Sequence, residues 1–121
     1  MAGIYDLQID QGATFSQGFQ WQSGNGTPIN LGGYLGNCVI RRSATSAEVL
    51  ATADIVVTDA VNGRFTVNMT ASQTAAIPTD GNAYKDKIQY VYDVYFSVGT
   101  SRYRVINGYA YVSPQVTKEV V

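Results

Sequence analysis

The residue types that catalysis uses most are scarce in this 121-residue chain, and their scarcity limits the chemistry that it can perform. The chain contains no histidine, which removes the usual general base, the commonest metal ligand and every Ser/His or Cys/His pair. The single cysteine, Cys38, lies in the segment NCVIRR, where we interpret it as a small buried strand residue and not as a nucleophile. We therefore predict no catalytic residue and expect that the protein is not an enzyme.

The nine acidic residues are the other groups that could act on a substrate or hold a metal ion. Two groups that are close in sequence are Asp54 with Asp59 and Asp80 with Asp86. A glycoside hydrolase needs only two carboxylates, which can be distant in sequence, so an acid pair is an alternative, although every aspartate here is also typical of a turn or a surface. The run DGN that begins at Asp80, together with Asp86, offers oxygen ligands for calcium, but it lacks EF-hand spacing and a closing glutamate. We interpret it as an ordinary loop, and we predict no metal and no cofactor.

Tyrosine is the residue type that suggests recognition, because seven of the nine tyrosines crowd the last third of the chain. An exposed tyrosine patch can stack on a sugar or form the apolar centre of a protein interface. The alternative is that tyrosine fills half-buried strand positions because its β propensity is high. The possible interface residues are Tyr84, Tyr95, Tyr103, Tyr109 and Tyr111.

Strand alternation assigns some of these rings to opposite faces. Asp93 and Tyr95 should lie opposite the apolar row that contains Tyr92 and Val94. We expect Gly108 to introduce a bulge that changes the side on which the following tyrosines lie.

The composition limits the partners. Only 14% of the residues are charged, the net charge is −1, and no run of Lys or Arg is longer than Arg41-Arg42. A duplex-binding protein needs clustered cations to neutralise phosphates, so we expect no nucleic acid partner. No stretch approaches the roughly 20 apolar residues that span a bilayer, so we expect no membrane insertion and a chain that folds in a reducing cytoplasm.

Short strands separated by turn residues must position these groups, and this pattern is typical of a sandwich or barrel. The predicted strands are residues 4–9, 14–22, 37–42, 48–52, 55–58, 64–69, 89–98 and 102–112. In the second strand Phe15, Phe19 and Trp21 share one face, which we therefore expect to be buried. No linker or fixed-period repeat interrupts the pattern, so we predict a single domain over residues 1–121.

Turn and cap residues mark the connections. Asn62-Gly63 is the strongest hairpin signal, and residues 23–26 and 98–101 are also typical turns. Thr70, with Gln73 three residues later, predicts a short helical turn near 70–77 that Pro78 ends. The predicted fold class is all-β: an Ig-like antiparallel β-sandwich with this one helical turn.

Two segments carry a family likeness. Residues 5–34, YDLQIDQGATFSQGFQWQSGNGTPINLGGY, contain a Gln-Gly-Ala-Thr-Phe step, an aromatic strand that ends in Trp21, a Gly/Asn turn and a Thr-Pro-Ile-Asn-Leu segment. Residues 104–118, RVINGYAYVSPQVTK, end in Val-Ser-Pro-x-Val-Thr. Together the segments cover over a third of the chain and resemble small Ig-like tail and baseplate structural proteins of tailed phages, such as N-terminal-type domains of baseplate upper proteins. The polar stretch 79–87 is longer than the corresponding connection in that family.

The resemblance implies a virion structural protein in the tail, baseplate or fibre-attachment region. Such a protein would be made in the host bacterial cytoplasm, and its partners would be other phage tail, baseplate or fibre proteins in a symmetric assembly of multiple copies. Tyrosine-rich faces and exposed edge strands would make the contacts. A capsid decoration or neck protein is one alternative, and a carbohydrate- or receptor-binding module is another.

Overall fold

The computed structural model describes residues 3–79 and 87–115, and its strands confirm the prediction of an all-β chain with one short helix. The strands run in the order β1-β8-β7-β4-β5-β6-β3, and β2 also pairs with β8. Their bounds are β1 Gly3–Ile4, β2 Leu7–Asp10, β3 Phe15–Gln20, β4 Leu35–Arg41, β5 Val49–Asp59, β6 Arg64–Met69, β7 Ile88–Val98 and β8 Ser101–Ser113, and the helix is α1 Ala71–Ala75.

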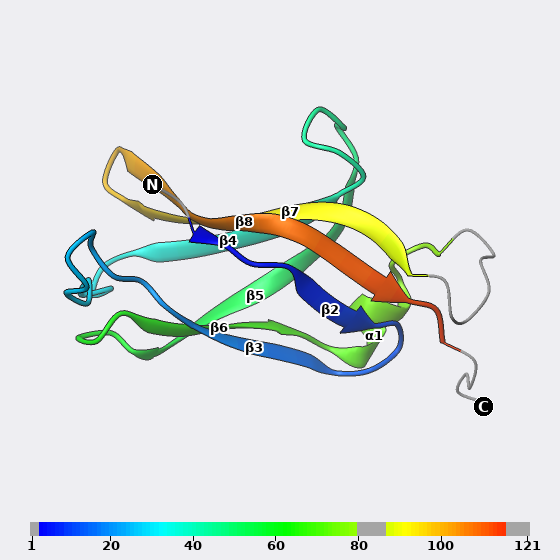
Figure 1. The fold of residues 1–121 in the computed structure, drawn as a ribbon, viewed down its shortest axis with the longest axis horizontal. Coiled ribbons are helices and arrows are strands. Elements are labelled where there is room, and N and C mark those ends of the chain that lie inside the picture. The colour runs from blue at the N-terminus through cyan, green and yellow to red at the C-terminus, as the bar shows by residue number, and fades with distance from the viewer. Residues whose placement is uncertain (1–2, 80–86, 116–121) are drawn as a thin grey trace.

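The sheet curls into two layers that share β5 (Figure 1). The first part of β5 pairs with β4, up to Ala53, and the rest pairs with β6, from Asp54 onward. The two strands predicted at 48–52 and 55–58 are therefore one strand of 11 residues. That prediction was wrong because no glycine or proline interrupts the segment, so the chain bends from one layer to the other without a turn.

The first strand also differs from its prediction, since residues 4–9 form the two strands β1 and β2, with Tyr5 and Asp6 between them. Both strands run parallel to β8, whereas the other pairings are antiparallel. The described sheet is therefore mixed and not wholly antiparallel. Parallel pairing is possible here because β2 and β8 are far apart in the chain and need no tight turn to join them.

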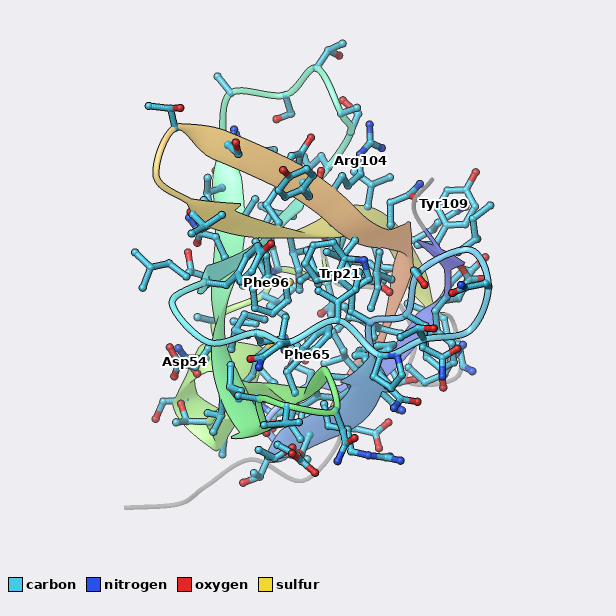
Figure 2. The ribbon with its side chains drawn as sticks, turned by 90° about the vertical axis from the view of Figure 1, so that its left-hand side faces the viewer. Trp21, Asp54, Phe65, Phe96, Arg104 and Tyr109 are labelled. Atoms are coloured by element: carbon cyan, nitrogen blue, oxygen red, sulfur yellow. The ribbon has the colours of Figure 1, made fainter. Side chains whose placement is uncertain are left out.

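The core lies between the two layers and is rich in aromatic rings. Phe65 of β6 and Phe96 of β7 are almost completely buried, at 1% and 0% exposure. Trp21 follows β3, and its ring stacks on Phe96 with centroids 5.8 Å apart. Figure 2 shows these three rings together in the interior. The row predicted on β3 therefore faces the core, although Phe15, Phe19 and Trp21 are half-buried and not fully buried.

The predicted turns are confirmed. Gly63 has φ +69° between β5 and β6, Gly99 has φ +57° between β7 and β8, and Gly26 has φ +86° in the turn after Trp21. A residue other than glycine is strained at such positive φ. At Gly63 the backbone also passes close to its neighbours, because an added Cβ would lie 2.6 Å from the carbonyl oxygen of Trp21.

The helix α1 begins as predicted. Thr70 is its N-cap, and a capping box joins Thr70 and Gln73. One turn later, the fully buried Thr74 hydroxyl donates to the Ala13 carbonyl at 2.8 Å and accepts the Gly12 N–H at 3.0 Å. The Gln-Gly-Ala segment therefore binds the helix and has a structural role.

Candidate interaction surface

The outer face of β4, β7 and β8 carries the polar and aromatic side chains that alternate with the core row. On β7 the buried residues Tyr92, Val94 and Phe96 alternate with the half-buried Asp93 and Tyr95, as the sequence predicts. On β8 the alternation breaks between Arg104 and Ile106, because the pairing with β7 shifts at this point. The unmatched residue is Val105.

The bulge is therefore at Val105, and the prediction of a bulge at Gly108 was wrong. Pairing with β7 is continuous through Gly108, which lies opposite Tyr92. Gly108 instead makes room for the segment between β1 and β2, since an added Cβ would lie 2.3 Å from the Tyr5 carbonyl oxygen. The adjacent Tyr109 N–H donates to the Asp6 carboxylate at 3.0 Å, and the Tyr92 hydroxyl donates to the Tyr5 carbonyl.

A groove of about 570 Å³ runs over this outer face, and we call it the outer groove. Its floor is apolar at Val39 and Val91, and Ile4 stands at its side with 81% of its surface exposed. Its polar lining includes Asp6, Asp93, Arg104 and Asn107, and Tyr109 also lines it. The groove thus combines apolar area with groups of both charges.

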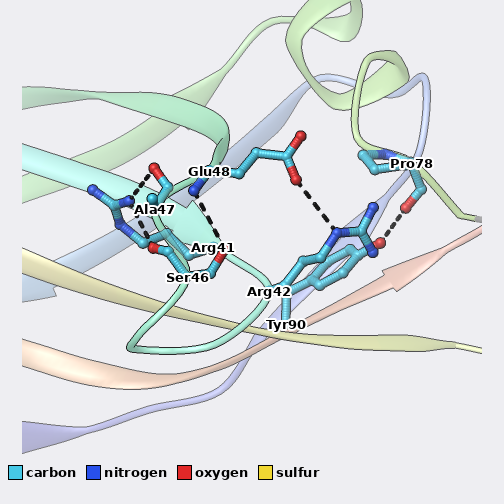
Figure 3. Close-up of polar contacts among 7 residues, drawn as sticks. All are labelled: Arg41, Arg42, Ser46, Ala47, Glu48, Pro78 and Tyr90. Atoms are coloured by element: carbon cyan, nitrogen blue, oxygen red, sulfur yellow. Dashed lines mark hydrogen bonds and ion pairs between the residues drawn. The ribbon is translucent and has the colours of Figure 1, made fainter.

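The arginines near this groove differ in what they bind. Arg41 donates from Nη1 to the carbonyl oxygens of Ser46 and Ala47, both at 3.0 Å, and so holds the loop between β4 and β5 (Figure 3). Arg102 lies over the Tyr95 ring, 4.3 Å from its centroid. The Arg104 side chain forms no hydrogen bond or ion pair with any residue in the described ranges, so its guanidinium is available to a partner.

The four predicted interface tyrosines within the described residues do not form one patch. Tyr109 and Tyr111 lie next to each other on β8, with ring centroids 6.0 Å apart, and Tyr109 is 45% exposed. Tyr95 is on the same face of the sheet but binds Arg102. Tyr103 precedes the bulge and its ring lies 5.9 Å from Trp21, at the core side of the sheet. Tyr84 lies outside the described residues.

Cys38 and the paired aspartates are the other residues that the sequence offers for chemistry. Burial, and to a smaller extent the nearby Asp93 carboxylate, raises the pKa of the Cys38 thiol to about 12, which keeps the sulfur protonated and weakly nucleophilic. Asp59 accepts hydrogen bonds from the Asn62 amide groups in the hairpin turn, and Asp54 is exposed on the same layer, where β5 pairs with β6. Asp80 and Asp86 lie outside the described residues.

The described residues contain neither a cluster of metal ligands nor a membrane-spanning helix. In residues 3–79 and 87–115, no group of three or more Cys, Asp or Glu side chains could hold a metal ion. In the same part of the chain no helix is both long and apolar enough to cross a membrane.

Sequence reasoning missed three of the groups in the outer groove, Arg104, Asn107 and Asp6. The position of Arg104 relative to Asn107 depends on the bulge, which the adjacent apolar pair Val105-Ile106 signals, because both side chains are buried. No local signal reveals Asp6, because its place depends on the parallel pairing of the N-terminal segment with β8.

Comparison with known proteins gives a weak structural likeness and no family. No family model matches the chain, and no curated protein matches it. Among solved structures it is similar to murine CRIg, with a TM-score of 0.39 and 8% sequence identity over 92% of each chain.

Proposed function

We propose that this chain is a structural protein of a tailed-phage virion that assembles through protein contacts on its outer face, in the tail, baseplate or fibre-attachment region. The observation that carries the docking part of the proposal is the outer groove. Its lining joins an apolar floor, an exposed tyrosine and an arginine whose side chain has no partner among residues 3–79 and 87–115. Tyr and Arg are the residues that most often dominate the binding energy of protein interfaces.

The virion context and the Ig-like identity of the sandwich rest on the resemblance of residues 5–34 and 104–118 to phage structural proteins. The fold gives Gln11, in the first of these segments, a structural role. Gln11 donates from Nε2 to the Ile77 carbonyl at 2.8 Å and accepts the Gln115 N–H at 3.0 Å, so it ties the start, the helix and the end of the described chain together. A rigid domain of this kind suits an assembly part that presents a fixed surface.

Mass spectrometry of purified phage particles, from a phage that encodes this chain, tests the proposal. We expect the chain in the particle at a fixed ratio to a tail or baseplate protein. Its presence in isolated heads and absence from isolated tails would instead support the decoration or neck alternative, and absence from the particle would overturn the proposal.

One observation supports the carbohydrate-binding alternative. Asp93, Asn107 and Tyr109 line the same groove, and carboxylate, amide and aromatic side chains are the groups that bind and stack on sugars. In a glycan array, binding that Tyr109→Ala abolishes would favour this alternative over a protein partner.

A further inference from the structure

The free edge of β3 is a second surface, on the other layer from the outer face. β3 is the last strand in the sheet order and pairs with β6 alone. Its other edge therefore carries backbone N–H and C=O groups that no strand of the described chain satisfies.

The register identifies these groups. Trp21 N–H donates to the Gly63 carbonyl at 2.8 Å, one residue beyond the last pair of β3 with β6. Hydrogen-bonded pairs alternate along antiparallel strands, so the amides of residues 17 and 19 point toward β6. Those of Ser16, Gly18 and Gln20 point away from it. The Gly18 carbonyl agrees with this assignment, since it accepts a hydrogen bond from the Gln17 side chain at 3.2 Å and not from β6.

This edge lacks the features that normally protect an edge strand. β3 has the sequence FSQGFQ and contains no charge and no proline, and its pairing with β6 shows no bulge. Gly18, at its centre, has no side chain, and a Cβ there would project from the face of the strand with nothing within 4 Å. The edge is therefore open to an approaching backbone.

The side chains beside the edge favour apolar contacts. Phe15 and Phe19 lie on the core side of β3 and are only half-buried. A groove of about 370 Å³ continues from Phe19 to Trp21 and is closed on its far side by residues 3–5 and by Val105 and Ile106. An added strand would cover these rings with every second side chain.

We propose that β3 accepts an extended segment of another polypeptide along its free edge, with apolar side chains at alternate positions. The regular spacing of outward amides at 16, 18 and 20 requires a β-strand, because only an extended backbone presents donors and acceptors at that repeat. The segment is a single strand and not the edge of a second folded copy. The Tyr5 ring already lies edge-on to Phe19, 5.3 Å between centroids, so β1 flanks the site and leaves the width of a groove. Tyr5 is 45% exposed and can turn aside for one strand.

This inference deepens the proposed assembly role, but its test requires no virion protein, so either can fail without the other. The probe is a synthetic peptide of residues 62–70, NGRFTVNMT. This sequence includes β6, whose buried row Phe65, Val67 and Met69 already matches β3 in antiparallel register on its paired edge. The control is the same peptide with N-methyl groups on alternate amides, which removes its hydrogen bonds to one side.

Amide hydrogen exchange of the full chain, followed by NMR, reports the occupied edge. At about 1 mM peptide we expect exchange at Ser16, Gly18 and Gln20 to slow by about tenfold or more, with little change at residues 17 and 19. The emission of Trp21, the single tryptophan, should shift in parallel because it lines the adjoining groove. The N-methylated peptide should cause neither change.

Two variants separate the edge from the rest of the site. Gly18→Pro removes one outward N–H, and we expect it to abolish the peptide effect. Gly18→Ala keeps that N–H, and we expect it to bind as the parent does, provided that both melt as folded proteins. No slowing at residues 16, 18 and 20 with the parent chain would overturn the proposal. The amides could instead be protected without peptide, with a protection that rises with protein concentration and with a dimer in sedimentation. This result would overturn the choice of occupant in favour of a second copy.

Discussion

The Phe65 ring lies edge-on against the Phe96 ring, with centroids 4.9 Å apart and planes at 77°. Phe65 comes from β6 and Phe96 from β7, so this contact joins the two layers of the curled sheet. Phe96 also stacks on Trp21, which places it at the centre of the aromatic core.

Replacing Phe96 with alanine should therefore weaken both layers. We expect Phe96→Ala to lower the free energy of unfolding by about 3–5 kcal/mol, because the cavity would remove contacts with rings on two elements. The control is Val98→Ala at the end of the same strand row, where the side chain is 38% exposed. Urea denaturation measures both, and equal losses would contradict the central position of Phe96.

The Thr74 hydroxyl offers a test of the link between the helix and residues 12–13. Thr74→Val keeps the shape but leaves the Gly12 N–H and the Ala13 carbonyl without their partner, so we expect a loss of about 1–3 kcal/mol. Thr58→Val, at an exposed position of β5, should change stability by less than about 0.5 kcal/mol. A Thr74→Val protein as stable as the parent would show that other groups satisfy this turn.

Two strand glycines should respond oppositely to the same substitution. Gly108→Ala places a methyl group 2.3 Å from the Tyr5 carbonyl oxygen, and we expect a loss of about 1–3 kcal/mol as β1 and β2 shift away from β8. Gly18→Ala meets open space and should leave stability unchanged or raise it by about 0.4–1 kcal/mol. Thermal melts of the pair would contradict this account if the order of stability were reversed.

Stability should also fall at alkaline pH. The Cys38 pKa rises from 9.0 to about 12 on folding because burial disfavours the thiolate. The unfolded chain therefore loses this proton first, so the contribution of Cys38 to stability is fully present below about pH 9 and is lost as the pH rises toward about 12. Burial raises the pKa of Tyr92 as well, which acts in the same direction.

Urea denaturation at pH 8 and pH 11 measures this effect. Cys38→Ala should lose less stability over this interval than the parent. Part of the loss remains in both proteins, because the pKa of Tyr92 is also raised on folding. An equal fall in both proteins would show that Cys38 does not contribute.

The elements that the sequence predicted well are those with a local signal. Asn62-Gly63 specifies its turn through residues that tolerate positive φ, and Thr70 with Gln73 specifies a cap through hydrogen bonds within one helical turn. Period-2 alternation was enough to place Tyr92 inside and Tyr95 outside, because β7 is regular through the core.

The errors concern contacts between distant segments. Whether residues 48–58 turn or bend depends on two partners, β4 and β6, that a single strand does not reveal. The outer groove likewise depends on the N-terminal segment lying beside β8 and on the bulge at Val105. The tyrosines alone did not indicate it, since they divide between faces.

The central claim is that the outer face docks a virion protein, and site-specific photo-crosslinking in the assembled particle tests it most directly. A photoreactive amino acid would replace Tyr109 in one variant and Asp54, exposed on the opposite layer, in the control, positions that Figure 2 shows on different sides of the molecule. We predict a crosslink from position 109 to a tail, baseplate or fibre subunit and none from position 54. Crosslinks from position 54 alone, or none to any particle protein from position 109, would contradict the claim.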